Sequence, residues 1–267
     1  MKLKSLGYTT DLFFPAFDGQ IIDRGEYLVI LSPENPEFYW GNFLLFSNPP
    51  IEGDFTRWQA LFAREIGEPP AVNHQVFAWD APQGDLGEAG QFLNQGFRLI
   101  NDAVMVLDAL IVPPDPAIAV NIRPLESEFD WAQALENQIE CSSDEDDKSG
   151  FREFITIKMR RYRRMVEAGL GNWFGAFSGG RLSADCGVFQ QDAIGRFQSV
   201  GTHPDFRRRG IAAKLVHEAG QWALNQFKLD RLVIVAEENS SAQRIYQSLG
   251  FTPVERQTGV EWWPDLA

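Results

Sequence analysis

The chain has 267 residues, of which 44% are hydrophobic and 23% charged, and its net charge is −13. This length and composition are those of a folded protein with one large domain or two modest ones and an ample core. The acidic balance argues against nucleic acids and anionic membranes as partners, because like charges repel at long range.

The two cysteines, Cys141 and Cys186, are far apart and form no CxxC pair. This spacing favours reduced thiols over a disulfide framework or a zinc site. The first residues, MKLKSLGYTTDLFF, lack the apolar stretch of a signal peptide. No run of about eighteen apolar residues is present that could cross a bilayer. We therefore expect a cytoplasmic protein without a membrane partner.

The first 112 residues predict a mixture of strands and helices. Hydrophobic runs predict strands at 26–32, 38–47, 73–80 and 102–110, and amphipathic patterns predict helices at 54–67 and 86–96. Three prolines within 113–116 exclude a helix or a central strand. Residues 113–117 are therefore predicted to be a Pro-rich linker between two domains, 1–112 and 118–267.

The remaining residues predict alternating strands and helices in a mixed order. Strands are expected at 118–125, 172–178, 181–190, 193–203 and 231–237, with the final two strands within 251–263, and helices at 126–140, 151–169, 210–227 and 239–250. This order is not a simple βαβ repeat. It predicts an α/β fold of the α+β kind, with helices layered on a mixed sheet.

Residues 203–215, HPDFRRRGIAAKL, place three arginines and a glycine between a predicted strand and a predicted helix. The first N–H groups of a helix lack partners, and the helix dipole favours an anion beside them. Gly210 and the small side chains of Ala212 and Ala213 let a ligand approach the backbone. The stretch matches neither G-x-x-x-x-G-K-[ST] nor G-x-G-x-x-G. It predicts a diphosphate site, and the alternative is an arginine-rich helix start on the surface.

Two segments resemble signature motifs of the GNAT superfamily of N-acetyltransferases. The first reads R-x-x-G-x-A at Arg207, Gly210 and Ala212. The second, NSSAQRIYQSLGF at 239–251, resembles N-x-x-A-x-x-x-Y-x-x-x-G-F and lies one helix and one strand later. The resemblance covers roughly residues 118–267 and implies a GNAT-like acyl-CoA N-acyltransferase fold.

The resemblance also implies that acetyl-CoA is the cosubstrate. Backbone groups of the strand before the corner would bind the pantetheine arm, backbone N–H groups of the corner would bind the diphosphate, and the start of the last helix would line the exit. In chain order, the implied cofactor-binding residues are Val200, Gly201, Thr202, Arg207, Arg208, Arg209, Gly210, Ile211, Ala212, Ala213, Asn239 and Ala242.

The chemistry implied by the resemblance is direct transfer of an acetyl group to a primary amine of a small molecule or peptide. Tyr246 matches the family's tyrosine acid, which protonates the departing thiolate; the alternative is an aromatic side chain packed under its helix. A backbone N–H near Val200 would stabilise the oxyanion. The general base stays open, because the strand carries Gln198 and Ser199 where many relatives have a glutamate. A water relay, Asp185 or an amine arriving partly neutral are the alternatives.

The first half contains a weak internal repeat of the second. GQFLNQGF at 90–97 echoes RIYQSLGF at 244–251, with Phe92 in the place of Tyr246. Because the first half also lacks R-x-x-G-x-A, residues 1–112 are predicted to be a degenerate GNAT-like domain without cofactor. This domain would shape the acceptor pocket or replace a dimer partner, and the oligomeric state stays open.

Three features of the sequence leave more than one interpretation open. The absent strand carboxylate and the degenerate half leave open a non-catalytic CoA-sensing or scaffold protein. The acidic run at 144–147 either attracts a cationic amine or is a solvated loop beside the next helix. The basic run KMRRYRR at 158–164 favours a solvated helix face over a nucleic-acid surface.

Overall fold

The computed structural model describes residues 1–141 and 148–264, and it separates into two compact units that we describe one at a time. Unit 1 comprises Met1–Val104, Ala236–Glu238 and Val254–Ala267, and unit 2 comprises Met105–Val235 and Asn239–Pro253. Three strands contribute residues to both units: β5 (Arg98–Leu107), β10 (Arg231–Glu237) and β11 (Phe251–Trp262). The acidic run at 144–147 lies outside the described residues.

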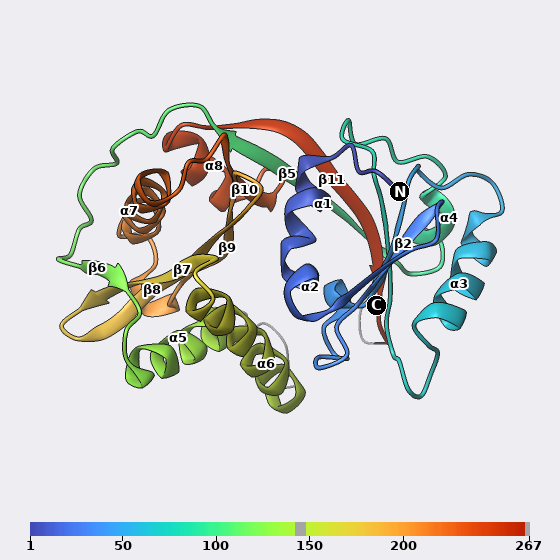
Figure 1. Ribbon diagram of the computed structural model, residues 1–267, viewed down its shortest axis with the longest axis horizontal. Coiled ribbons are helices and arrows are strands. Elements are labelled where there is room, and N and C mark those ends of the chain that lie inside the picture. The colour runs from blue at the N-terminus through green and yellow to red at the C-terminus, as the bar shows by residue number, and fades with distance from the viewer. Residues whose placement is uncertain (142–147, 265–267) are drawn as a thin grey trace. The chain divides into compact units, whose positions relative to one another are not determined.

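Unit 1 is a mixed sheet with short helices (Figure 1). Its strands follow the order β1, β2, β3, β4, β11, β5; β3 and β4 are parallel, and β11 is antiparallel to β4. Its other elements are α1 (Leu6–Asp11), α2 (Phe13–Asp18), β1 (Gln20–Asp23), β2 (Tyr27–Leu31), η1 (Tyr39–Gly41), β3 (Phe43–Phe46), α3 (Asp54–Glu65), β4 (Gln75–Trp79) and α4 (Gly90–Leu93).

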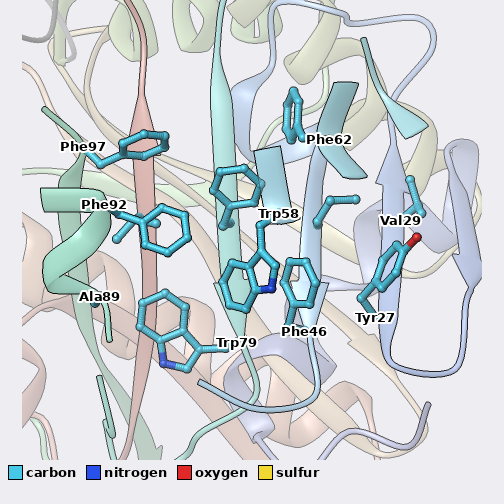
Figure 2. Packing of buried hydrophobic residues seen from close by; sticks show 12 residues of the cluster. Tyr27, Val29, Phe46, Trp58, Phe62, Trp79, Ala89, Phe92 and Phe97 are labelled. Carbon is cyan, nitrogen blue, oxygen red and sulfur yellow. The ribbon is translucent and has the colours of Figure 1, made fainter. Parts of the chain in front are cut away.

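Aromatic side chains fill the interior of unit 1 on one face of its sheet (Figure 2). Trp58 of α3 is 1% exposed, and its ring stacks on Phe46 at a centroid distance of 3.7 Å. Phe62 lies one helical turn further along α3 and is fully buried, as the i, i+4 spacing of apolar residues requires. Phe92 of α4 belongs to the same cluster.

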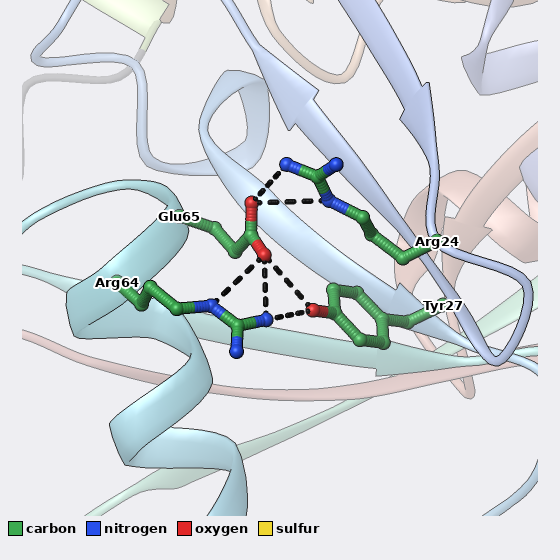
Figure 3. Close-up of polar contacts among 4 residues, drawn as sticks. All are labelled: Arg24, Tyr27, Arg64 and Glu65. Atoms are coloured by element: carbon green, nitrogen blue, oxygen red, sulfur yellow. Dashed lines mark hydrogen bonds and ion pairs between the residues drawn. The ribbon is translucent and has the colours of Figure 1, made fainter.

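The end of α3 is fixed to the β1–β2 hairpin by a polar cluster (Figure 3). The Glu65 carboxylate accepts hydrogen bonds from Arg24 at 2.7 Å, from Arg64 at 2.7 Å and from the Tyr27 hydroxyl at 3.0 Å. These contacts, the Arg24 hydrogen bond first, lower the pKa of Glu65 to about 2. Each of the four side chains has at least one hydrogen-bond partner within the cluster, so the cluster has a structural role.

Unit 2 is a mixed sheet covered by four described α-helices, three of which are longer than any helix described in unit 1. The strand order is β10, β9, β8, β7, β6, in which β10 is parallel to β9 and the other pairs are antiparallel. Figure 1 shows α7 on one face of this sheet and α5 with α6 on the other. The elements are β6 (Asn121–Pro124), α5 (Glu128–Cys141), α6 (Lys148–Glu167), β7 (Gly171–Ser178), β8 (Arg181–Gln191), β9 (Ile194–Thr202), η2 (Pro204–Phe206), α7 (Ile211–Gln226) and α8 (Ser241–Ser248).

The predicted α/β mixed-sheet fold is confirmed, but the units do not divide at the predicted linker. Residues 113–117 lie inside unit 2, and the strand residues 254–262 belong to unit 1. Proline excluded regular structure at 113–117, as expected, yet a segment without regular structure can still pack within a unit. The segment 251–263, which was predicted to form the final strands, is the single strand β11, and its sequence gave no sign that its two ends serve different units.

Two smaller differences concern local structure in unit 1. The run 38–47 is not one strand, because Asn42 interrupts it: its side-chain amide donates to the carbonyls of Asn35 and Phe38, and its carbonyl accepts from Ser32 N–H. The helices α1 and α2 were not predicted, since each has only six residues. Within the described residues, no helix is both long and apolar enough to cross a bilayer.

Candidate functional site

The parallel strands β9 and β10 of unit 2 pair only at their beginnings. The register joins Ile194–Arg196 to Arg231–Val233, and these two described strands share no pairing beyond it, although β9 continues to Thr202 and β10 to Glu237. Backbone N–H and C=O groups need partners. The second halves of β9 and β10 therefore offer backbone groups to an extended ligand.

A β-bulge lies in β9 just beyond the last pair with β10. Between the pairs Asp185–Gly201 and Gly187–Gln198, β9 has one residue more than β8. Ser199, inside the bulge, has a φ of 49°, which is rare for a residue with a side chain. A bulge bends a strand and re-aims its backbone groups.

The chain turns a tight corner between β9 and α7. After the short helix η2, Arg208 and Gly210 both adopt left-handed backbone conformations, with φ of 63° and 78°. Gly210 is the N-cap of α7 and, because glycine has no side chain, it provides no side-chain cap for the helix start. Left-handed residues in such corners turn successive N–H groups toward one point.

The first turn of α7 has the properties of an anion site. It contains no acidic side chain, and the first N–H groups of a helix have no partner within it. Ile211 is buried, whereas Ala212 and Ala213 are half-buried. Their small side chains leave the N–H groups accessible, and the uncompensated helix dipole favours a phosphate.

The three arginines of the corner differ in what they do. Arg207 Nε donates to the Thr202 carbonyl at 3.2 Å, and Arg209 donates to the Asp205 carbonyl at 3.0 Å. In the part of the chain that the structure describes, the exposed side chain of Arg208 makes no such contact. Two arginines therefore brace the corner, and one is available to a ligand.

The proline-rich segment at 113–117 packs beside this corner. Ala117 N–H donates to the Arg209 carbonyl at 2.9 Å, and Lys214 Nζ lies 3.6 Å from the Asp115 carboxylate. A cavity of about 310 Å³ lies between the segment and α7. It is lined by Asp115, Pro116, Ile118, Ala119, Val120, Ile122, Lys214 and Glu218. The segment is thus a wall of unit 2 beside the corner.

The start of α8 is well capped. Asn239 has a φ of 65°, and its N–H donates to the Gln243 side chain at 2.6 Å. The Ser240 hydroxyl accepts from Gln243 N–H at 3.1 Å. The Asn239 side chain is left exposed and Ala242 half-buried. Both predicted exit residues are therefore accessible at the end of β10.

Tyr246 of α8 points into unit 2 and is 5% exposed. Its ring meets Phe251 edge-on at 6.4 Å. Burial, with a smaller contribution from the neighbouring Cys186 thiol, raises the pKa of Tyr246 well above its usual value. Cys186 itself lies in β8, opposite the bulge of β9.

Asp185 is fully buried on β8 and makes no ion pair among the described residues. Its carboxylate accepts hydrogen bonds from the side chains of Asn137, Gln138 and Trp173, the last two at 3.0 and 2.7 Å. Burial raises the pKa of Asp185 to about 7, and the three hydrogen bonds act in the opposite direction. Since both oxygens are already engaged, the geometry does not favour Asp185 as a base that touches an amine.

Gln198, which stands where many relatives would have a glutamate, is also engaged. Its side-chain amide donates to the Tyr162 hydroxyl at 2.9 Å. Tyr162 comes from the basic run at 158–164 and is 2% exposed, and its neighbour Arg163 pairs with Glu128. These residues of the basic run therefore serve packing and ion pairing within unit 2.

Comparison with known proteins identifies the domain around this site. The family model described as "Acetyltransferase (GNAT) domain" matches residues 170–253. This range includes the unpaired ends of β9 and β10, the corner before α7 and Tyr246. Residues 170–253 are therefore similar to the acetyltransferase domain of the GNAT family.

Curated GNAT relatives match only part of the chain. Aminoglycoside N(6′)-acetyltransferase type 1 of Salmonella typhimurium (strain LT2) is 34% identical over 53 residues, which are 20% of this chain and 37% of that protein. The protein of the same name from Salmonella enteritidis gives the same values. The chain thus matches little more than a third of the length of these relatives.

Solved structures extend the GNAT-like fold to most of the chain. A functionally unknown conserved protein from Staphylococcus epidermidis ATCC 12228 has a TM-score of 0.70, with 92% of this chain and 94% of that chain covered at 14% identity. A GCN5-related N-acetyltransferase from Kribbella flavida has a TM-score of 0.64, with 95% and 93% covered at 16% identity.

A tandem GNAT protein from the clavulanic acid biosynthesis pathway has a TM-score of 0.53, with 79% of this chain and 70% of that chain covered at 12% identity. Identities this low show the fold alone. The predicted tandem GNAT-like fold is confirmed, in the first half as well as the second.

The two GNAT-like halves differ at the strand ends. In unit 1, the parallel strands β3 and β4 stay paired through Phe46 and Trp79, and Asp80 N–H continues the ladder by donating to the Phe46 carbonyl at 2.9 Å. Phe92, which matches Tyr246 in the sequence repeat, is fully buried and has no hydroxyl. The early end of pairing between β9 and β10 in unit 2 therefore has no counterpart between β3 and β4 in unit 1.

The helix corner of unit 1 keeps the backbone shape but has the opposite charge. Gly53, the N-cap of α3, has a φ of 87°, close to that of Gly210. Asp54 follows it, and its carboxylate accepts from Ile51 N–H at 2.9 Å and pairs with Arg57 at 2.8 Å. An acidic side chain already compensates this helix dipole, so a phosphate is disfavoured.

Proposed function

We propose that the chain is an N-acetyltransferase that moves an acetyl group from acetyl-CoA to a primary amine of a small molecule or peptide, and that unit 2 alone binds the cosubstrate. The observation that carries this proposal is the lost pairing between β9 and β10, which leads directly into the uncapped first turn of α7. An extended arm ending in a diphosphate matches both features at once.

The site residues that we propose divide by the part of acetyl-CoA that they would bind. Backbone groups of residues 200–202 would bind the pantetheine arm, and those of residues 207–213 the diphosphate, with Arg208 adding a positive charge. Asn239 and Ala242 would line the exit. This division is supported by their order along β9, the corner and α8.

The transfer itself needs one proton to move from nitrogen to sulfur. The amine attacks the thioester carbonyl while both substrates are bound, the C–S bond breaks, and the nitrogen loses a proton while the CoA sulfur gains one. Tyr246 is the proposed donor to sulfur, because its raised pKa keeps the phenol protonated at neutral pH. A backbone N–H of the bulge near Val200 would stabilise the oxyanion.

The proton acceptor for the amine is proposed to be water or bulk solvent. Asp185 is saturated with hydrogen bonds, and Gln198 cannot ionise. An amine that arrives neutral needs no dedicated base. The acceptor panel should therefore include amines of low pKa, and also aminoglycosides, since the curated relatives act on that class by name.

A direct test is incubation with acetyl-CoA and an amine panel, with release of free thiol as the readout. We expect turnover with at least one amine. Tight CoA binding without turnover on any amine would favour the second candidate, a CoA-sensing or scaffold protein, for which the engaged Gln198 in place of a carboxylate is the supporting observation. Absence of CoA binding would contradict both.

A further inference from the structure

The Asp185 network has no role in the chemistry proposed above, yet it reaches the bulge of β9. Gln138 of α5 uses both hydrogens of its amide nitrogen, one toward Asp185 at 3.0 Å and one toward the Ser199 carbonyl at 2.9 Å. Asn137 donates to the same carboxylate oxygen. The buried carboxylate thus fixes the orientation of the amide that holds the bulge.

The contact with Ser199 explains an otherwise unfavourable backbone conformation. A carbonyl in a regular strand points along the sheet toward a neighbouring strand. The Ser199 carbonyl instead points out of the sheet toward α5, and Ser199 has a left-handed φ of 49°. Such a conformation persists only where surrounding contacts hold it. Gln138 supplies that contact.

Gly201 shows that the close approach of α5 is built into the sequence. Its φ is not in the left-handed region, so its backbone does not require glycine. A Cβ at this position would lie 3.0 Å from Gln138 Nε2 and 3.1 Å from Cys141 Sγ. A side chain at residue 201 would therefore require the ends of the Gln138 and Cys141 side chains to shift by a few tenths of an ångström.

We propose that Gln138, oriented by Asp185, is a positioning residue that holds the β9 bulge in the shape that binds acetyl-CoA. This inference rests on the proposed function, because the bulge carries the Val200 backbone groups assigned to the pantetheine arm and the oxyanion. Asp185 itself touches neither substrate.

The experiment compares two glutamines of α5. Gln138→Leu removes the contact to the bulge. Gln133→Leu is the matched control, because the Gln133 side chain accepts from Leu182 N–H of β8 at 3.0 Å, away from the bulge. For each full-length variant, CoA affinity is measured by calorimetry, and amide hydrogen exchange of residues 198–202 is measured without ligand.

We expect Gln138→Leu to weaken CoA binding at least tenfold and to speed exchange at residues 198–202 at least tenfold, whereas Gln133→Leu changes neither. Wild-type affinity and wild-type exchange in a folded Gln138→Leu variant would overturn the inference, as would equal effects of both variants. If the wild-type protein binds no CoA, the proposed function fails. The exchange comparison then still decides whether Gln138 holds the bulge.

Discussion

Tyr246 is a buried side chain of α8 whose ring packs against Phe251. If it donates the proton to sulfur, Tyr246→Phe should lower kcat by about 100-fold or more, the usual contribution of a general acid. CoA affinity should stay at the wild-type level, because the substitution removes one oxygen and no packing atom. Steady-state kinetics together with calorimetry would measure both quantities.

Two outcomes separate the roles of Tyr246. Unchanged kcat would show that Tyr246 has only a packing role, through the contact of its ring with Phe251. Weaker CoA binding with unchanged kcat would move the hydroxyl from proton donation to cofactor binding.

Asp185 predicts an unusual pH dependence of stability. Burial raises its pKa from 3.8 to about 7, so between these values the folded state binds more protons than the unfolded state. The stability contributed by this group is therefore full below about pH 4 and lost as the pH rises through about 7. We expect a loss of a few kcal/mol over this window, since each pKa unit corresponds to about 1.4 kcal/mol.

Asp185→Asn should flatten this part of the pH profile, because asparagine does not ionise. Denaturant unfolding from pH 4 to 8 would show it as a difference between variant and wild type. Taking the difference matters, since carboxylates with lowered pKa, such as Glu65, lose their contribution at low pH instead. Parallel profiles would contradict the prediction.

At the scale of single residues, the sequence predicted the features that depend only on the local backbone conformation. Gly210 and the small residues after it predict a helix start open to an anion, and the backbone shape there involves only neighbouring residues. The Ser199 bulge and its contact to Gln138 could not be predicted, because they join residues 61 positions apart. Gly201, a glycine inside a predicted strand, was the signal of a close approach.

At the scale of elements, α7 and α3 begin alike and should respond differently to the same change. Gly210→Glu places a negative charge beside the proposed diphosphate. Two like charges about 4 Å apart repel by about 4 kcal/mol near a protein surface. CoA affinity should therefore fall about 1,000-fold in calorimetry.

Gly53→Glu is the matched control for this substitution. Gly53, at the start of α3, has a left-handed conformation like that of Gly210, and a Cβ added at Gly53 would meet nothing within 4 Å. Both variants carry the backbone strain of a non-glycine residue, so thermal stability should fall similarly. Equal loss of CoA affinity in both would show that strain, and not the charge at α7, is responsible.

The boundaries of elements were predicted best where hydrophobic patterns were long. The predicted helix at 210–227 corresponds to α7 at Ile211–Gln226, and the strand at 231–237 to β10. The predicted helix at 86–96 shrank to Gly90–Leu93, because glycine and short apolar spacing support only one turn. The early end of pairing between β9 and β10 has no signature in either strand.

At the scale of the whole molecule, the residues of β11 from Val254 onward complete unit 1. Val260 is fully buried in the aromatic cluster, whereas Val254 is 49% exposed. Val260→Asp would bury an unpaired carboxylate at a cost of several kcal/mol, so unit 1 should lose its structure. Val254→Asp, on the same strand, should change stability by no more than about 0.5 kcal/mol.

Hydrogen exchange resolved along the chain would check this prediction. In Val260→Asp, protection should be lost in β2, β3 and β4, more than 180 residues earlier in the sequence. Retained protection in those strands would show that unit 1 does not need β11. The Val254→Asp profile should match the wild type.

Two GNAT-like halves were foreseeable from the repeat of residues 90–97 at 244–251. Their composition was not, because nothing in the residues 251–263 marks which of them belong to which unit. The Pro-rich segment at 113–117 was the natural place for a boundary in the sequence. Contacts to Arg209 and Lys214 instead made it part of unit 2.

The late position of β11 also bears on how the protein is made. During synthesis, domains usually fold in the order in which they leave the ribosome. Here residues 1–104 emerge first but must wait for 254–262, which emerge only after all of unit 2. Residues 1–104 are therefore the last to be completed by their partner strand, and the aromatic cluster of unit 1 lacks Val260 until translation reaches that strand.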